Sequence, residues 1–276
     1  MNMKLKTKDS LTGFLLCFPA ITGLVIFFVI PFIICIYISF TENTGSNAFV
    51  GFDNYIDIVN SAAFKLAAWN TFKFNITAVP LIMIFSLCVA LLLHKKLKGY
   101  DLFRSVFIFP LVLPVASVVL FFRLIFSGGE INWFNSEYSL GVLIVLYIWK
   151  NCGYNIILFL AALNSIPKEY YEASQIDGAN SRTRLFKITF PLILPYSFFI
   201  LIISIINSFK SFREAYILFG AYPDDSVYML QHFMNNNFGN LNYVRLACGA
   251  IIIFAAIFAF VLILLKLKDK TGDIEL

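Results

Sequence analysis

Long apolar runs separated by short polar segments make up most of this chain. Each run is about as long as an α-helix must be to cross the hydrocarbon core of a bilayer, about 20 residues. Prolines interrupt several runs, which membrane helices tolerate because neighbouring groups satisfy the freed backbone. The pattern predicts six membrane spans, at about residues 11–40, 71–93, 105–126, 140–163, 192–212 and 244–267.

Composition supports this interpretation. Of the 276 residues, 60% are hydrophobic and 13% are charged, with a mean hydropathy of +0.82. Soluble domains carry about 25% charged residues. The 32 phenylalanines suit a surface that faces lipid. We therefore expect an all-α integral membrane protein that forms a single transmembrane domain over residues 1–276, in contact with membrane lipid.

The positions of the basic residues predict the orientation in the membrane. With six spans, both termini lie on the same side, and the positive-inside rule makes the side richer in Lys and Arg cytoplasmic. The two tails and the connectors after the second and fourth spans are the basic ones, with Lys4, Lys6, Lys8, Lys95, Lys96, Lys98, Arg104, Lys168, Arg182, Arg184, Lys187, Lys266, Lys268 and Lys270. We expect both termini, Lys96 and Arg184 to be cytoplasmic, and Asn54 and Asn237 to lie outside.

Several kinds of chemistry find no support in the sequence. The five cysteines are odd in number and have no ligand-like spacing, which argues against a disulfide framework or a metal site. There is no phosphate-binding loop of the Walker type, so this chain is not expected to bind ATP by itself. An intramembrane enzyme or an ion channel would need catalytic carboxylates, a metal set or a selectivity filter, and none is visible. No nucleic-acid partner is expected.

Residues 164–190 form a charged insert between two apolar runs. We expect two short helices with a break between them. Pro167 suits the first turn of a helix, with Ser165 as a possible N-cap. Gly178 is the expected end, because glycine adopts the left-handed conformation without steric cost. Asn180 or Ser181 can cap the second helix.

The spacing within this insert resembles a known signature. Glu172-Ala173-Ser174, then Gly178, then Ile188-Thr189-Phe190-Pro191 resembles the cytoplasmic loop of ABC importer permeases, which reads Glu-Ala-Ala, three residues, Gly, nine residues, Ile-any-Leu-Pro. Ser174 and Phe190 depart from that pattern. The short segments at residues 164–167 and 176–179 resemble those of the carbohydrate-uptake, maltose-type branch of the family. The alternative is a plain surface loop.

This resemblance implies a type I ABC importer permease, a subunit that moves a sugar or oligosaccharide across the cytoplasmic membrane of a prokaryote. It implies three protein partners: a second, similar permease, two copies of a cytoplasmic ATPase and an extracytoplasmic sugar-binding protein. The subunit would be non-enzymatic and would bind no cofactor, with ATP and Mg²⁺ used by the partner ATPase. A permease for a non-sugar solute, such as a phosphate ester, amino acid or polyamine, is the alternative.

The resemblance also makes residues 169–179 the coupling helix that docks on the ATPase. Tyrosines give broad contact area at low entropic cost, and Glu172 offers a charge-assisted contact. The small side chains at 173 and 174 allow close approach. The candidate coupling residues are Tyr170, Tyr171, Glu172, Ala173, Ser174, Asp177, Gly178 and Ala179. In the alternative, Tyr171 and Ile176 pack against this chain's own helices.

Polar residues in the fourth and fifth predicted spans suggest a solute path. Such groups are expensive at membrane depth unless they are paired or line a wet cavity, and a sugar needs hydrogen-bonding groups and aromatic faces. Residues three or four apart share a helix face. The candidates are Trp149, Asn151, Tyr154, Asn155, Ser204, Asn207, Ser208 and Ser211. In the alternative, Ser and Asn join helices to one another. Lys150 falls in mid-span, whereas Lys210, Arg213 and Glu214 are expected to reach the membrane interface.

Overall fold

The computed structural model describes residues 2–43, 45, 48–95, 100–127, 133–134 and 136–272. These residues form helices, joined by short turns, and the described part contains no β-strand beyond one isolated bridge between Thr41 and Phe49. The chain divides into two compact units. Residues 1–61 with 237–256 make the first unit, and residues 62–236 with 257–276 make the second.

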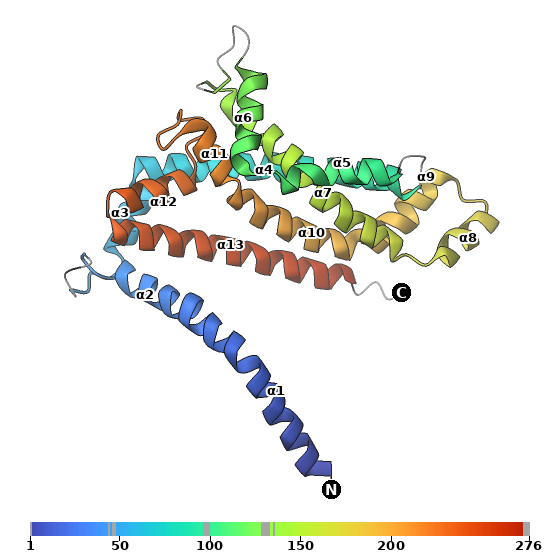
Figure 1. Cartoon of the computed structure of the whole chain (residues 1–276), viewed down its shortest axis with the longest axis horizontal. Coiled ribbons are helices and arrows are strands. Elements are labelled where there is room, and N and C mark those ends of the chain that lie inside the picture. Colours follow the sequence, from blue (N-terminus) through green and yellow to red (C-terminus); the bar gives the residue numbers. More distant parts are fainter. Residues whose placement is uncertain are drawn as a thin grey trace. The chain divides into compact units, whose positions relative to one another are not determined.

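The first unit begins with one long, continuous helical run. It consists of α1 (Asn2–Leu24), a π-helical segment (Val25–Val29) and α2 (Ile30–Ser39), and it is followed by α3 (Asp53–Asn60) and the first half of α13 (Tyr243–Gly272) (Figure 1). The end of α2 is fixed by polar contacts. The Asn54 side chain donates to the backbone oxygens of Ser39 (3.0 Å) and Thr41 (2.9 Å), and the Tyr55 and Ser39 hydroxyls lie 2.6 Å apart.

The second unit contains the remaining helices. They are α4 (Ala62–His94), α5 (Tyr100–Val112), α6 (Val115–Phe126), α7 (Ser139–Asn164), α8 (Lys168–Ile176), α9 (Ser181–Arg184), a π-helical segment (Leu185–Thr189), α10 (Phe190–Lys210), α11 (Phe212–Phe219) and α12 (Leu230–Gly239), which runs on into the first unit.

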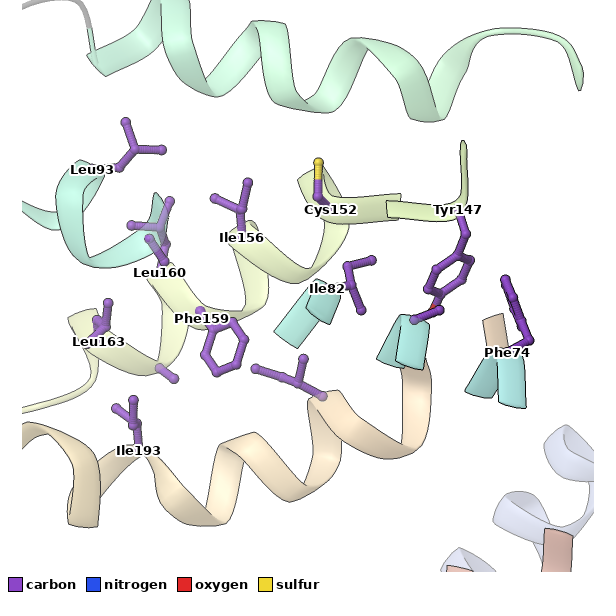
Figure 2. Packing of buried hydrophobic residues seen from close by; sticks show 14 of the residues in the cluster. Phe74, Ile82, Leu93, Tyr147, Cys152, Ile156, Phe159, Leu160, Leu163 and Ile193 are labelled. Atoms are coloured by element: carbon purple, nitrogen blue, oxygen red, sulfur yellow. The ribbon is translucent and has the colours of Figure 1, made fainter. Parts of the chain in front are cut away.

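The core of the second unit lies between α4, α7 and α10. Figure 2 shows side chains of these three helices meeting, among them Ile82 of α4, Phe159 of α7 and Ile193 of α10, each at most 1% exposed. Lipid is as apolar as these side chains, so close packing and interhelical hydrogen bonds, rather than exclusion from water, hold such helices together. This packing fixes α7 and α10 side by side.

A glycine lets α5 approach α7 closely. A Cβ atom built on Gly153 would lie 2.0 Å from the backbone oxygen of Phe107 and 2.7 Å from its carbonyl carbon. No side chain fits there, because the obstructing atoms belong to the backbone. The sequence gives no sign of this contact, since Gly153 lies among polar residues of α7.

The predicted spans correspond to long apolar helices. Five described helices are long and apolar enough to cross a membrane: Thr12–Ser39, Ala62–His94, Ser139–Asn164, Ser181–Phe219 and Tyr243–Leu267. The third predicted span is bent by 108° between Ser105–Val112 and Val115–Phe126, and it completes six spans if both halves count as one. Pro114 precedes α6 and explains the break, because proline lacks the N–H that would continue the helix.

Two predicted boundaries differ from the helices. The helix of the second span begins at Ala62 rather than near residue 71, and that of the fifth at Ser181 rather than near residue 192. Both extensions are more polar than a lipid-facing helix, so hydropathy alone missed them.

Several of the basic residues used to predict the orientation are not described. Lys96 and Lys98 lie outside the described residues, as do the side chains of Lys4, Lys6, Lys8, Arg104, Lys268 and Lys270.

Candidate functional site

Helix α8 lies in the insert between α7 and α10, and its C-terminal end has a well-defined cap. Gly178 has φ +75°, the left-handed conformation expected from the sequence. The Gly178 N–H donates to the Gln175 oxygen (3.1 Å), and the Ala179 N–H donates to the Ser174 oxygen (2.9 Å). These two bonds form a Schellman motif, which ends the helix and turns the chain away sharply. Figure 1 shows α8 at the end of the unit where α7 ends and α10 begins.

The second half of the insert is continuous with the fifth span. The Asn180 side chain caps α9 by accepting from the Thr183 N–H (2.8 Å), one of the two caps that we expected. A π-helical segment, Leu185–Thr189, follows and leads directly into α10, which has Pro191 as its second residue. The proposed N-cap role of Ser165 is wrong. Ser165 instead ends α7, where its hydroxyl donates to the Ala162 oxygen (2.7 Å).

Helix α8 presents two different faces. Tyr171 and Ser174, three residues apart, face this chain's own helices: Ser174 is buried, and the Tyr171 hydroxyl lies 3.0 Å from the Thr189 hydroxyl. Of the other candidate coupling residues, Tyr170 is 42% exposed; Ile176, on the same helix but not among the candidates, is 88% exposed. Ala179 is half-buried, and the exposed candidates also include Glu172, Ala173, Asp177 and Gly178. The alternative in which both side chains pack against this chain's own helices therefore holds for Tyr171 but not for Ile176.

A cavity of about 840 Å³ lies against α7, α10 and α11. Four of the predicted path residues line it, two on α7, one on α10 and one in the turn after α10. They are Asn151, Tyr154, Asn207 and Ser211. Gln231 of α12 also lines the cavity; it was missed because nothing in its local sequence connects that helix with α7. Amide, phenol and hydroxyl groups thus line the same cavity as the apolar side chains of Leu111, Val115, Ile203 and Ile206.

The other four predicted path residues lie elsewhere. The Asn155 amide donates to the Ser204 hydroxyl (2.8 Å), and both side chains are buried between α7 and α10. The Ser208 hydroxyl donates to Asn75 of α4 (2.5 Å). Trp149 stacks on Phe121 with ring centroids 5.7 Å apart. Ser204, Ser208 and Asn155 therefore occupy the helix-joining positions of the alternative interpretation, and Trp149 packs against α6.

The cavity also holds four charged residues. Lys150, near the middle of α7, forms an ion pair with Glu214 in the first turn of α11. Glu214 is 4% exposed, so the expectation that it reaches the membrane interface is wrong. Lys210 and Arg213 are exposed and line the same cavity. The sequence feature that could have indicated this charged cavity was Lys150, because a charged side chain in mid-span needs an ionic partner or water.

Metal binding has no visible basis in the described part of the chain. Within those residues, no group of three or more His, Cys, Asp or Glu side chains converges in a way that could hold a metal ion.

Comparison with known proteins supplies the family. The profile described as "Binding-protein-dependent transport system inner membrane component" matches residues 78–268. The arabinooligosaccharides transport system permease protein AraP of Bacillus subtilis is 33% identical over 218 residues, which cover 72% of this chain and 69% of AraP. The trehalose/maltose transport system permease protein MalF of Thermococcus litoralis is 27% identical over 293 residues and covers 99% of both chains.

A solved structure shares the fold. A chain of a bacterial alginate ABC transporter, crystallised with an alginate pentasaccharide-bound periplasmic protein, matches with a TM-score of 0.81 at 20% identity and covers 96% of each chain. The helical architecture, the signature loop and the family match therefore all indicate the same class of protein. This chain belongs to the inner-membrane components of binding-protein-dependent transport systems, the multi-pass permease subunits of ABC importers.

Proposed function

We propose that this permease imports a sugar or oligosaccharide, and that α8 couples the transport path to ATP hydrolysis in a partner subunit. One observation carries the proposal. The insert that holds α8 joins α7 to α10, and these two helices supply most of the cavity wall. A displacement of α8 would therefore move both walls of the cavity together.

The exposed face of α8 is suited to docking. Glu172 and Ile176, four residues apart, share this face and offer a carboxylate and an aliphatic side chain, while the ring of Tyr170 is exposed on another side of the helix. An Ile side chain that is 88% exposed outside the apolar runs gains from burial against a partner, because that removes apolar area from water. The proposed partner is a cytoplasmic ATPase, present in two copies, that uses ATP and Mg²⁺. This chain itself binds neither and remains a non-enzymatic subunit.

The cavity is suited to a carbohydrate. A sugar ring presents hydroxyl groups that donate and accept hydrogen bonds, and Asn151, Tyr154, Asn207 and Ser211 offer matching groups. The relatives named for arabinooligosaccharides and for trehalose/maltose support the same substrate class. In this proposal, a second permease completes the path, and an extracytoplasmic binding protein delivers the solute from the side opposite α8. Both termini are cytoplasmic.

A second candidate is an acidic solute, such as a phosphate ester. Because Lys150 is paired with Glu214, Lys210 and Arg213 remain as excess positive charge among the residues lining the cavity. Such charge would favour an anion. The sequence already left a phosphate ester open as an alternative solute, and the fold adds that Lys210 and Arg213 line the same cavity as Lys150.

One experiment separates the two candidates. The permease is reconstituted into proteoliposomes with its partner subunits, ATP inside and binding protein outside. Uptake of radiolabelled maltotriose, trehalose and arabinotriose is compared with that of glycerol 3-phosphate. We expect ATP-dependent uptake of at least one neutral sugar. Uptake of the phosphate ester alone would reject the sugar proposal in favour of the second candidate.

A further inference from the structure

The ion pair between Lys150 and Glu214 sits at an unusual place. Lys150 lies near the middle of a span and Glu214 near the end of another, and their side chains are 15% and 5% exposed. Both line the cavity. Charged groups at membrane depth are costly, and they are found paired or next to water-filled cavities that serve a function.

Stability alone gives little reason for such a pair. Removing two charges from water costs about as much free energy as their attraction returns, and well-packed apolar residues often serve as well. Apolar side chains such as Leu111 and Val115 already line the same cavity. A charged pair at this position is therefore better explained by a task that apolar side chains cannot perform.

One carboxylate oxygen of Glu214 is unused. Lys150 Nζ contacts Oε1, whereas Oε2 is buried and has no hydrogen-bond partner among the described residues. A buried acceptor without a donor carries the desolvation penalty with no compensation. Glu214 lines the cavity, and the terminal torsion of a Glu side chain is broad, so its carboxylate is free to adjust to a donor there.

We propose that Glu214 is a specificity-determining residue that accepts a hydrogen bond from a hydroxyl group of the transported sugar, while Lys150 holds its carboxylate in place. The inference rests on the proposed function of sugar uptake. A hydroxyl donor suits an ionised acceptor, and such charge-assisted bonds are about twice as strong as neutral ones. The ligand class is therefore a polyhydroxylated solute, recognised at the junction of α7 and α11.

The test compares transport rates of a sugar and its monodeoxy analogues. The reconstituted transporter is supplied with saturating, sugar-loaded binding protein, so that the affinity of the binding protein does not enter the rate. The parent sugar is whichever of maltotriose, trehalose or arabinotriose is taken up. In the wild type, we expect one analogue to be transported about tenfold more slowly than the parent, because it lacks the donor for Glu214.

Two variants separate recognition from structure. Glu214→Gln removes the charge but keeps the shape of the side chain. The double exchange Lys150→Glu with Glu214→Lys keeps an ion pair but moves the carboxylate from α11 to α7. We expect both to assemble with the ATPase and to lose the discrimination, so that the parent-to-analogue ratio falls toward one. Glu137→Gln, at an exposed position outside the cavity, is the control and should keep the ratio.

The outcomes are distinct. If the variants slow the parent and every analogue by the same factor, or if the exchange restores wild-type rates and ratios, the pair is structural and this inference is wrong, although sugar transport by the wild type still stands. If the wild type moves no neutral sugar, both this inference and the proposed function are wrong.

Discussion

The Asn155 amide on α7 donates a 2.8 Å hydrogen bond to the Ser204 hydroxyl on α10, and both side chains are buried. The Tyr147 hydroxyl of α7 also donates to the Ser204 backbone oxygen (2.7 Å). These bonds connect the two helices that flank the insert at residues 164–190. They therefore favour joint movement of α7 and α10 when α8 is displaced.

Neighbouring positions on α10 should respond differently to a bulky side chain. Asn207 lines the cavity, whereas Ser208 is 5% exposed and bonded to Asn75. We expect Asn207→Trp to block uptake while the protein still assembles with its ATPase. Ser208→Trp should instead prevent assembly, because an indole does not fit between α4 and α10. Ser208→Ala should lower stability by only about 0.5–1.5 kcal/mol, the contribution of one neutral hydrogen bond, and should still assemble and transport. Uptake and co-purification of the ATPase are measured together; normal uptake by Asn207→Trp would contradict the proposed path.

Reversal of one charge on α8 should uncouple the transporter. Glu172 is exposed on the face proposed to dock on the ATPase. We expect Glu172→Lys to reduce uptake to background while its amount in the membrane stays normal, because like charges would meet at a partly desolvated contact. Immunoblotting and uptake assays check both points. Glu137→Lys, also at an exposed position but remote from α8 in sequence, is the control; full activity of Glu172→Lys would remove the coupling role from this residue.

The orientation of the chain is open to a labelling test. We expect Arg184→Cys to be protected from a membrane-impermeant maleimide in sealed cells, and Asn240→Cys to react. The five native cysteines are replaced first. Asn240 is a better outer probe than Asn54, whose amide bonds two backbone oxygens and would be lost on substitution. Labelling of residue 184 from outside would overturn the orientation derived from the basic residues.

The contact of α5 with α7 should not tolerate a methyl group. Gly153→Ala would place a Cβ 2.0 Å from the Phe107 backbone oxygen, so the helices must separate. We expect a loss of about 1–3 kcal/mol in stability, the usual cost of overpacking. Gly141→Ala, on the same helix, meets nothing within 4 Å and should leave the melting temperature unchanged. Equal melting temperatures of the two variants, measured in detergent, would show that α5 does not pack this closely.

The stability of the connector before α13 should depend on pH through His232. Its Nδ1 accepts from the Met229 N–H (3.2 Å), its Nε2 has no partner among the described residues, and burial lowers its pKa to about 4. An unfolded His has a pKa of about 6.5. Between these two values the unfolded chain binds the proton and the folded chain does not, so stability is complete above about pH 6.5 and falls as the pH drops toward 4.

Across this pH range the His232 contribution to the free energy of unfolding falls by about 3 kcal/mol, because each unit of pKa shift corresponds to about 1.4 kcal/mol. His232→Gln does not titrate, so we expect its melting temperature to fall less than that of the wild type between pH 7.5 and 4.5. Because carboxylates titrate in both proteins, only the difference between them is informative. Identical pH profiles of the two proteins would contradict the assignment to His232.

The sequence by itself determined the apolar spans, the signature loop and several of its local turns. These depend on local properties: length and hydropathy for the spans, and glycine's access to positive φ for the end of α8 at Gly178. The cap at Asn180 was predicted for the same reason, because its side chain bonds a backbone N–H only three residues away. The bend at Pro114 was not predicted, since prolines in spans are compatible with straight helices as well as broken ones.

Only the tertiary structure decided which polar side chains line the cavity. Asn151 and Asn155 are one helical turn apart and look alike in sequence, yet one faces the cavity and the other bonds Ser204. The choice depends on how α10 is rotated against α7, and that follows from the whole packed interface. The partnership of Lys150 with Glu214 joins residues 64 positions apart, and no local rule connects them. Helix rotation and long-range pairing depend on contacts between distant segments, so they appear only once those segments are packed together.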